Sequence, residues 1–235
     1  MPQPSSLTDV LFFAIVVLVA AFYVAAILRT ARPGESRGRT LGTVTLLLAV
    51  SLVVPGALAG LGLLDRYDPM PAPGLLVVLI VTICTLLLAF SRVGARLATG
   101  LPLAVLVGYQ VFRVPLEVLL HRLYVEGVIP VEMTYEGRNF DVVTGLTAAV
   151  LAILLAKGRA SRKLVIAWNA LGLVLLANIV AVAVLATPTP FQLFTDGPPN
   201  LLPSMLPYVW LPTVLVQAAL LGHLLVFRAM RLGSE

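Results

Sequence analysis

The sequence has little charge and almost no cysteine. Charged residues make up 11% of its 235 residues, and Cys84 is its single cysteine. Soluble domains carry roughly 25% charged residues, so this chain cannot cover a soluble core of its length with a hydrated surface. One cysteine cannot form a disulfide within the chain, which excludes a disulfide-stabilised fold. The composition therefore indicates a protein that folds among lipids.

Familiar catalytic signatures are also absent. The chain lacks the phosphate-binding G-x-x-x-x-G-K-[ST], the zinc-binding H-E-x-x-H, the nucleophile elbow G-x-S-x-G and the redox motif C-x-x-C. Its last apolar run, Tyr208–Phe227, contains no lysine, so a retinal Schiff base has no attachment residue there. The few ionisable side chains are then the best guide to function.

The sequence does contain many long apolar runs. Its residues are 60% hydrophobic, and runs of about 20 apolar residues, long enough to cross a bilayer core of roughly 30 Å as a helix, recur throughout. We therefore predict an all-α, polytopic integral membrane protein with a single seven-helix transmembrane domain over residues 1–235. The predicted spans are Thr8–Leu28, Leu41–Leu64, Leu75–Phe90, Leu97–Leu120, Val142–Ala156, Leu164–Ala186 and Tyr208–Phe227.

The basic residues predict an orientation for these spans. Cytoplasmic loops carry an excess of Lys and Arg, and the excess falls on one side when the N-terminus is outside and the C-terminus is cytoplasmic. The outside segments then carry only Arg66, Arg122 and Arg138. We expect a multi-pass protein of the plasma membrane, the inner membrane of a bacterium. The inside segments carry Arg29, Arg32, Arg37, Arg39, Arg92, Arg96, Lys157, Arg159, Arg162, Lys163, Arg228 and Arg231.

The net charge of +5 does not indicate nucleic-acid binding, because the basic residues lie in short loops where they set orientation. The lipid bilayer is the expected partner. Gly56 and Gly60 form a G-x-x-x-G in the second span, a motif that lets helix backbones approach closely. We expect these glycines to pack helices within the chain; the alternative is a contact in a homo-oligomer.

Five polar side chains form a stripe on the predicted fourth span. At about 100° per residue, they fall within an arc of about 80° on one face of a helix. Such a stripe turns away from lipid, because a lone charged side chain in hydrocarbon costs about 3 kcal/mol or more. Glu117, four residues after Arg113, is the expected partner of that arginine. The stripe consists of Gln110, Arg113, Glu117, His121 and Tyr124.

The segment after the stripe concentrates further polar side chains. Its glycines and proline break any long helix, so we expect residues 121–141 to form an irregular external loop. Together with residues 187–207, this loop is predicted to cap the outer face. Asn139 or Asp141 is expected to cap the next helix, with a role in the site as the alternative for Asp141. The loop residues assigned to the site are Glu132, Glu136, Arg138, Asn139 and Asp141.

A divalent metal is one possible occupant of this site. Glu117 and His121 are four residues apart, so both side chains can converge on a metal or share a proton. Two ligands do not complete a metal site, and further carboxylates would have to come from the following loop. The second histidine, His223, lies near the inner end of the last span, at a depth roughly 20 Å from His121. Haem ligation by these two histidines is not expected, and His223 is interpreted as a packing residue.

Three functions fit this pattern. The leading hypothesis is an extracytoplasmic-side polar site that binds a small polar ligand or ion, for recognition or transport, with Arg113 holding an anionic group or pairing with Glu117. The first alternative is a membrane-embedded enzyme that uses Glu117 or His121 as general base or metal ligand. The second is an accessory or assembly subunit of a membrane complex. Transport and catalysis both need buried ionisable groups beside a cavity, so the sequence does not separate them.

Overall fold

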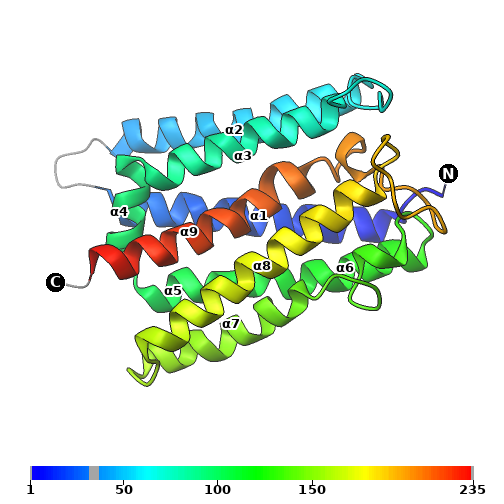
Figure 1. Cartoon of the computed structure of the whole chain (residues 1–235). Helices are drawn as coiled ribbons and strands as arrows, with labels where there is room; N and C mark the ends of the chain where they lie inside the picture. Colours follow the sequence, from blue (N-terminus) through cyan, green and yellow to red (C-terminus); the bar gives the residue numbers. More distant parts are fainter. Residues whose placement is uncertain (1, 32–36, 234–235) are drawn as a thin grey trace.

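A computed structural model describes residues 2–31 and 37–233 of the chain (Figure 1). Helices account for 74% of it, and no strand lies within these two ranges, so the all-helical prediction is confirmed. Most helices run along one common direction, and the two termini lie at opposite ends of the bundle. Arg32, one of the basic residues of the predicted inside segments, lies outside the described residues.

Within the described residues, five stretches are long and apolar enough to cross a membrane. They are α1 (Ser6–Arg29), α3 (Pro73–Phe90), the continuous stretch of α5 (Leu103–Gly108), η1 (Tyr109–Phe112) and α6 (Arg113–Val125), α8 (Arg162–Ala186), and η4 (Leu211–Leu215) with α9 (Val216–Leu232). Two more helices, α2 (Arg37–Gly60) and α7 (Asp141–Ala156), contain shorter apolar stretches. Short 3-10 turns, η2 (Val131–Met133) and η3 (Leu202–Ser204), lie in the connections before α7 and before η4.

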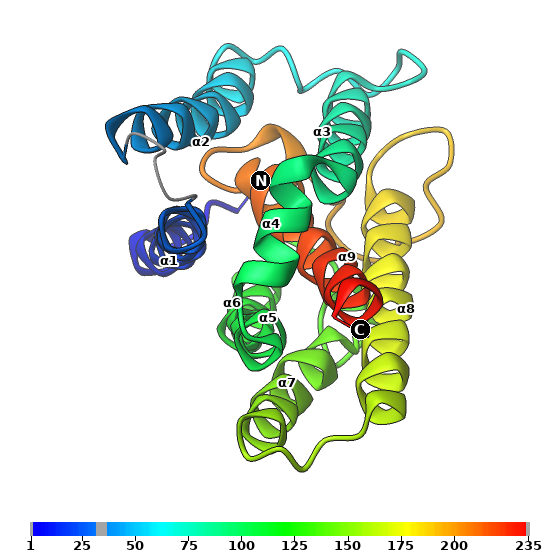
Figure 2. The same ribbon diagram turned by 90° about the vertical axis from the view of Figure 1, so that its left-hand side faces the viewer.

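The last helix, α9, lies at the centre of the bundle and packs against α3, α5 and α8 (Figure 2). Around it, α7 packs against α5, α6 and α8, and α1 packs against α2 and α6. Large apolar side chains are nevertheless exposed on the outer faces of α1, α2, α3 and α8. An apolar exterior around a packed interior is the arrangement that a bilayer stabilises.

The predicted fourth span began at the wrong residue. We expected Leu97–Leu120, but the helix α4 (Arg92–Gly100) ends before Pro102, and the apolar stretch starts again at Leu103. Proline disfavours helical backbone at the residue before it and lacks an N–H to donate, so the chain turns at this point. The helix α4 then crosses the end of the bundle (Figures 1 and 2), with the buried Leu97 on its inner side.

The two glycines of the G-x-x-x-G motif face side chains of the same chain. A Cβ added to Gly56 would lie 3.5 Å from the Trp210 ring, and one added to Gly60 would lie 3.4 Å from Leu206. The indole N–H of Trp210 donates a hydrogen bond to the carbonyl of Leu52 in α2 (2.9 Å). In this arrangement the glycines hold α2 against the segment that leads into α9.

Hydrogen bonds around Glu126 link the start of α1 to the end of α6, and we call this group of residues the polar tie. The carboxylate of Glu126 accepts hydrogen bonds from the backbone N–H of Ser5 (3.0 Å), the hydroxyl of Thr8 (2.7 Å) and Nε of Arg122 (3.1 Å). Partial burial acts to raise the pKa of Glu126, but these donors outweigh it and hold the pKa below its ordinary value. The ionised carboxylate therefore holds α1 in place.

We expect this tie to weaken in acid. Because the folded-state pKa of Glu126 lies below the unfolded value, its contribution is present above about pH 4.5 and is lost as the pH falls through the folded value. The difference in thermal midpoint between the wild type and Glu126→Gln should therefore be largest near neutral pH and shrink toward about pH 3. A Glu126 difference that grows in acid would contradict the assignment.

Candidate functional site

A buried arginine lies where α6, α7 and α9 meet. Arg113, the first residue of α6, is 1% exposed. Its Nε donates a hydrogen bond to Oδ2 of Asp141 on α7 (2.6 Å), and its Nη2 forms an ion pair with the same oxygen. Its Nη1 lies 2.9 Å from Nε2 of His223 on α9. The guanidinium is therefore compensated inside the bundle, as a charge at this depth requires.

A glycine brings Asp141 within reach of Arg113. Gly145 lies one turn after Asp141, and a Cβ added there would lie 2.7 Å from Val114 Cγ2 and 3.3 Å from Arg113 Cβ. Without a side chain at this position, α7 can lie directly against α6. The hydroxyl of Thr144 donates to Oδ1 of Asp141 (3.4 Å), and the free N–H groups of the first helical turn favour a carboxylate there.

His223 is held in one tautomer by Asn169 of α8. The amide nitrogen of Asn169 donates to the backbone carbonyl of His223 (2.9 Å), which turns the amide oxygen toward His223 Nδ1 (2.8 Å). The proton is thus on Nδ1, and Nε2 is left as an acceptor for the Arg113 guanidinium. In this arrangement the imidazole is neutral and serves to orient the arginine.

Glu117 lies one turn after Arg113 and is bound differently. It is 2% exposed, and its Oε2 accepts a hydrogen bond from the side-chain amide of Asn139 (2.6 Å). The same amide nitrogen donates to the carbonyl of Met133 (3.1 Å), while its oxygen accepts the backbone N–H of Asp141 (3.1 Å). Asn139 therefore fastens the connection between α6 and α7 to the carboxylate.

Arg113, Asp141, His223, Glu117 and Asn139 form one buried group, which we call the Arg113 cluster. Its charges do not balance when both carboxylates are ionised. Arg113 carries one positive charge and is engaged by Asp141 and His223. Glu117 adds a second carboxylate and repels Asp141. With both carboxylates ionised the cluster has a net charge of −1, and among the described residues only Asn139 donates a hydrogen bond to Glu117. A buried carboxylate with one donor has unused capacity to accept a proton, a cation or a further donor.

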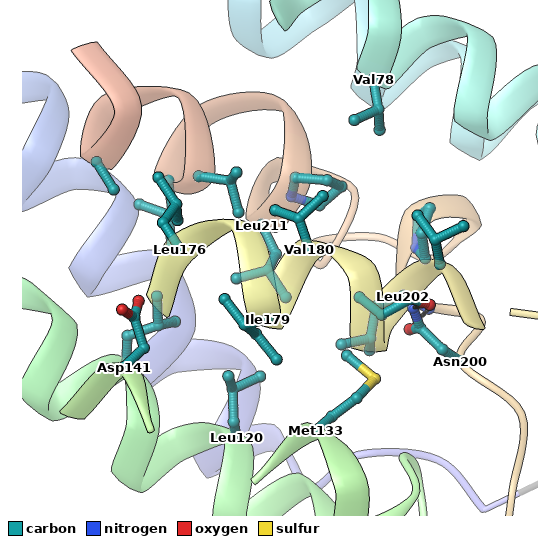
Figure 3. Close-up of a pocket in the computed structure, with 18 of the residues that line it drawn as sticks. Val78, Leu120, Met133, Asp141, Leu176, Ile179, Val180, Asn200, Leu202 and Leu211 are labelled. Atoms are coloured by element: carbon teal, nitrogen blue, oxygen red, sulfur yellow. Dashed lines mark hydrogen bonds between the residues drawn. The ribbon is translucent and has the colours of Figure 1, made fainter. Parts of the chain in front are cut away.

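A cavity adjoins this cluster. Arg113, Glu117 and Asp141 line a partly open space of about 90 Å³, whose remaining walls are almost wholly apolar. Figure 3 shows Asp141 and the labelled apolar side chains around this space. The walls come from α3, α6, α8 and α9, and the turns η2 and η3 add Met133 and Leu202. The volume exceeds the roughly 30 Å³ share of one water in the liquid, so the space admits more than a single molecule of water. The cavity therefore has charged residues on one part of its wall and apolar side chains on almost all of the rest.

Comparison with known proteins identifies the family. Residues 70–231 match the model of a family described as a domain of unknown function, DUF8737. The chain belongs to the DUF8737 family. No curated protein and no solved structure matches it. The matched DUF8737 segment contains α3 to α9 and with them every residue of the Arg113 cluster, whereas α1, α2 and Ser5 and Thr8 of the polar tie lie outside it.

Four of the ten predicted site residues come together in this DUF8737 domain. Arg113, Glu117, Asn139 and Asp141 form the cluster described above. Gln110 is also fully buried, but its amide donates to the carbonyl of Ala219 (3.0 Å) and makes no hydrogen bond to the cluster.

The other predicted residues lie apart from the cluster. His121 Nε2 lies 2.9 Å from Glu136, and its ring stacks on Tyr135 and meets Tyr124 edge-on. Arg138 is exposed and lies over the ring of Phe194, with 5.3 Å between Cζ and the ring centroid. Glu132 is half-buried, and no hydrogen bond of its side chain reaches the cluster. Glu117 and His121 thus have different partners, and no group of three or more metal-ligating side chains occurs among the described residues.

Two expectations about partners were wrong, and the alternatives for the cap of α7 are resolved. Arg113 pairs with Asp141 and not first with Glu117, because α7 approaches α6 closely at Gly145. Of the two residues expected to cap α7, Asn139 accepts the backbone N–H of Asp141 (3.1 Å), whereas the oxygens of Asp141 bind Arg113 and Thr144 and give it the alternative role in the site. His223 lies at the level of Arg113 and not near the inner end of the bundle, because Arg113 stands at the middle of the stretch from Leu103 to Val125.

The sequence interpretation missed His223, Asn169 and Thr144 as members of the site. The available signal was that a histidine and an asparagine lie within long apolar helices, where each needs a partner. Spacing along one helix could not show that these partners are on other helices.

Proposed function

We propose that the chain crosses the membrane seven times, with its N-terminus outside and its C-terminus in the cytoplasm of a bacterial cell. Support comes from the five long apolar stretches together with the shorter ones in α2 and α7. The termini at opposite ends of the bundle fit an odd number of crossings. Under this topology the basic loops are cytoplasmic, and Asn139, Glu117 and the cavity lie toward the outer side.

The proposed function is binding of a small ligand or ion through Glu117, for recognition or transport. One observation carries it: a buried carboxylate beside a cavity has Asn139 as its donor and forms no ion pair with any residue that the structure describes, because Arg113 is engaged by Asp141 and His223. Such a group accepts a positive charge or an N–H or O–H donor. In this proposal Arg113 positions the cluster and does not hold an anion.

Thermal shift measurements on the purified full chain test this function. The probes are ammonium, ethanolamine and Na⁺, with acetate and phosphate as the anionic arm. We expect at least one cationic probe to raise the thermal midpoint of the wild type, Glu117→Gln to abolish the shift, and the exposed control Glu136→Gln to retain it. The proposal fails if no cationic probe shifts the midpoint, if the shift survives in Glu117→Gln, or if only the anions act.

The same observation favours one further candidate, a membrane-embedded enzyme in which Glu117 accepts a proton from a bound substrate. The two candidates differ in what Glu117→Gln removes. For a binding protein the affinity falls, whereas for an enzyme the ligand still binds and is no longer converted.

A further inference from the structure

The cavity beside Glu117 opens between two helices that scarcely touch. Leu75 and Val78 of α3 form one wall, and Val180 and Val184 of α8 form the opposite one. All four side chains are half-buried, and α3 and α8 make little direct contact with each other. Seen along the bundle, both helices lie beside α9, with α3 above it and α8 to its right (Figure 2). We call this opening the α3–α8 seam.

The surface around the seam is apolar. On α3, Leu79 is 54% exposed, and on α8, Val174 is 64% exposed. Both helices are among those long and apolar enough to cross a membrane. In a bilayer the α3–α8 seam therefore opens toward acyl chains and not toward water.

The end of the cavity nearest the connecting turns is closed. Met133 of η2 and Leu202 of η3 line it there, and they are 2% and 0% exposed (Figure 3). The other polar lining residues are already engaged: the Asn200 amide donates to the Ala183 carbonyl (3.0 Å) and to the Thr187 hydroxyl (3.3 Å). Glu117 thus keeps spare acceptor capacity on the wall of an almost wholly apolar cavity.

We propose that the ligand is a bilayer lipid that enters sideways through the α3–α8 seam. Its aliphatic chain lies between the two helices, and its polar end carries N–H donors to the Glu117 carboxylate. When Glu117 is ionised, the group of Arg113, Asp141 and Glu117 lacks one positive charge, and this favours an ammonium group on the ligand. This inference rests on the proposed function, since it keeps Glu117 as the acceptor and adds the ligand class and its route.

Native mass spectrometry of the full chain from nanodiscs tests the proposal. The nanodiscs contain equal amounts of phosphatidylethanolamine, whose ammonium has N–H donors, and phosphatidylcholine, whose quaternary ammonium has none. We expect the wild type to retain phosphatidylethanolamine over phosphatidylcholine by about tenfold, the ratio expected for one hydrogen bond to a charged group. Glu117→Gln should abolish that preference.

Two variants narrow the seam from its two sides. Val180→Trp and Val78→Trp should each lower the retained lipid severalfold, whereas the lipid-facing controls Val174→Trp and Leu79→Trp should match the wild type. Having a variant on each wall keeps the test informative if one of them does not fold. The proposal is overturned if neither seam variant lowers retention, if both lipids are retained equally, or if no lipid is retained.

These results separate the lipid from the broader function. If the lipid tests fail while Glu117→Gln still abolishes the ammonium or ethanolamine shift, the ligand is water-soluble and only the lipid inference falls. If that thermal shift also survives in Glu117→Gln, the proposed function falls with it.

Discussion

Replacing Asp141 with alanine should destabilise the folded protein by about 3–5 kcal/mol, the cost of removing one partner from a buried ion pair. Arg113 is 1% exposed and loses the carboxylate that binds its Nε and Nη2. His223 does not replace the lost charge, because its Nε2 accepts a hydrogen bond as a neutral group. The measurement is the free energy of unfolding of the purified chain in detergent.

Two variants control for this effect. Asp196→Ala removes an exposed carboxylate from the connection between α8 and α9 and should change stability by no more than about 0.5 kcal/mol. The double variant Arg113→Met with Asp141→Leu should recover most of the loss, because it removes both charges and keeps apolar volume. An Asp141→Ala protein as stable as Asp196→Ala would show that the ion pair does not hold α6 and α7 together.

Gly172→Ala should destabilise the protein by about 1–3 kcal/mol, the range for overfilling a packed interior. A Cβ at this position on α8 would touch Cε1 of His223 and lie 2.8 Å from its Nε2 and 3.0 Å from Thr144 Cγ2. The imidazole cannot move aside cheaply, because Asn169 holds one nitrogen and Arg113 the other. The added methyl group therefore acts on the cluster itself.

Gly42→Ala is the matched control. Gly42 is also helical, and a Cβ there would meet nothing within 4 Å. Alanine is favoured over glycine inside a helix by about 1 kcal/mol, so this variant should be as stable as the wild type or more stable. If thermal unfolding gives the same small gain for Gly172→Ala, the tight fit of His223 against α8 is wrong.

The sequence was enough to find the part of the cluster that lies on α6. Polar residues spaced three and four apart on an apolar helix identify the inward face, and Arg113 and Glu117 lie on it, both buried. The pattern also included His121, which lies close to the helix end and pairs with Glu136 at the surface. The spacing of residues along a helix shows which face a side chain lies on. It does not show whether other helices cover that face near the end of the helix.

The pairing inside the bundle could not be predicted from that pattern. Whether Arg113 binds Glu117 or Asp141 depends on how closely α7 approaches α6, and this distance follows from Gly145 facing Val114 on another helix. The same holds for His223, whose role requires Asn169 of α8 and Arg113 of α6 at once. Contacts between helices depend on packing, which one-dimensional spacing does not contain.

The helices of the fold were likewise predicted in part from the sequence. Apolar runs placed most helices correctly, because their length and composition suffice to recognise a membrane span. The error at the fourth span came from reading through Pro102, where a short helix with an apolar inner side passes for the start of a longer one. A proline inside an apolar run was the signal for that boundary.

The central claim is that the two carboxylates of the cluster have opposite roles: Asp141 holds Arg113, and Glu117 is left to a ligand. Comparing the thermal midpoints of Asp141→Asn and Glu117→Gln, each of nearly unchanged shape, tests it most directly. We expect Asp141→Asn to lower the midpoint strongly, and Glu117→Gln to leave it unchanged or raise it, because the second change removes an unpaired buried charge. Equal losses in both variants, or the larger loss in Glu117→Gln, would contradict the account.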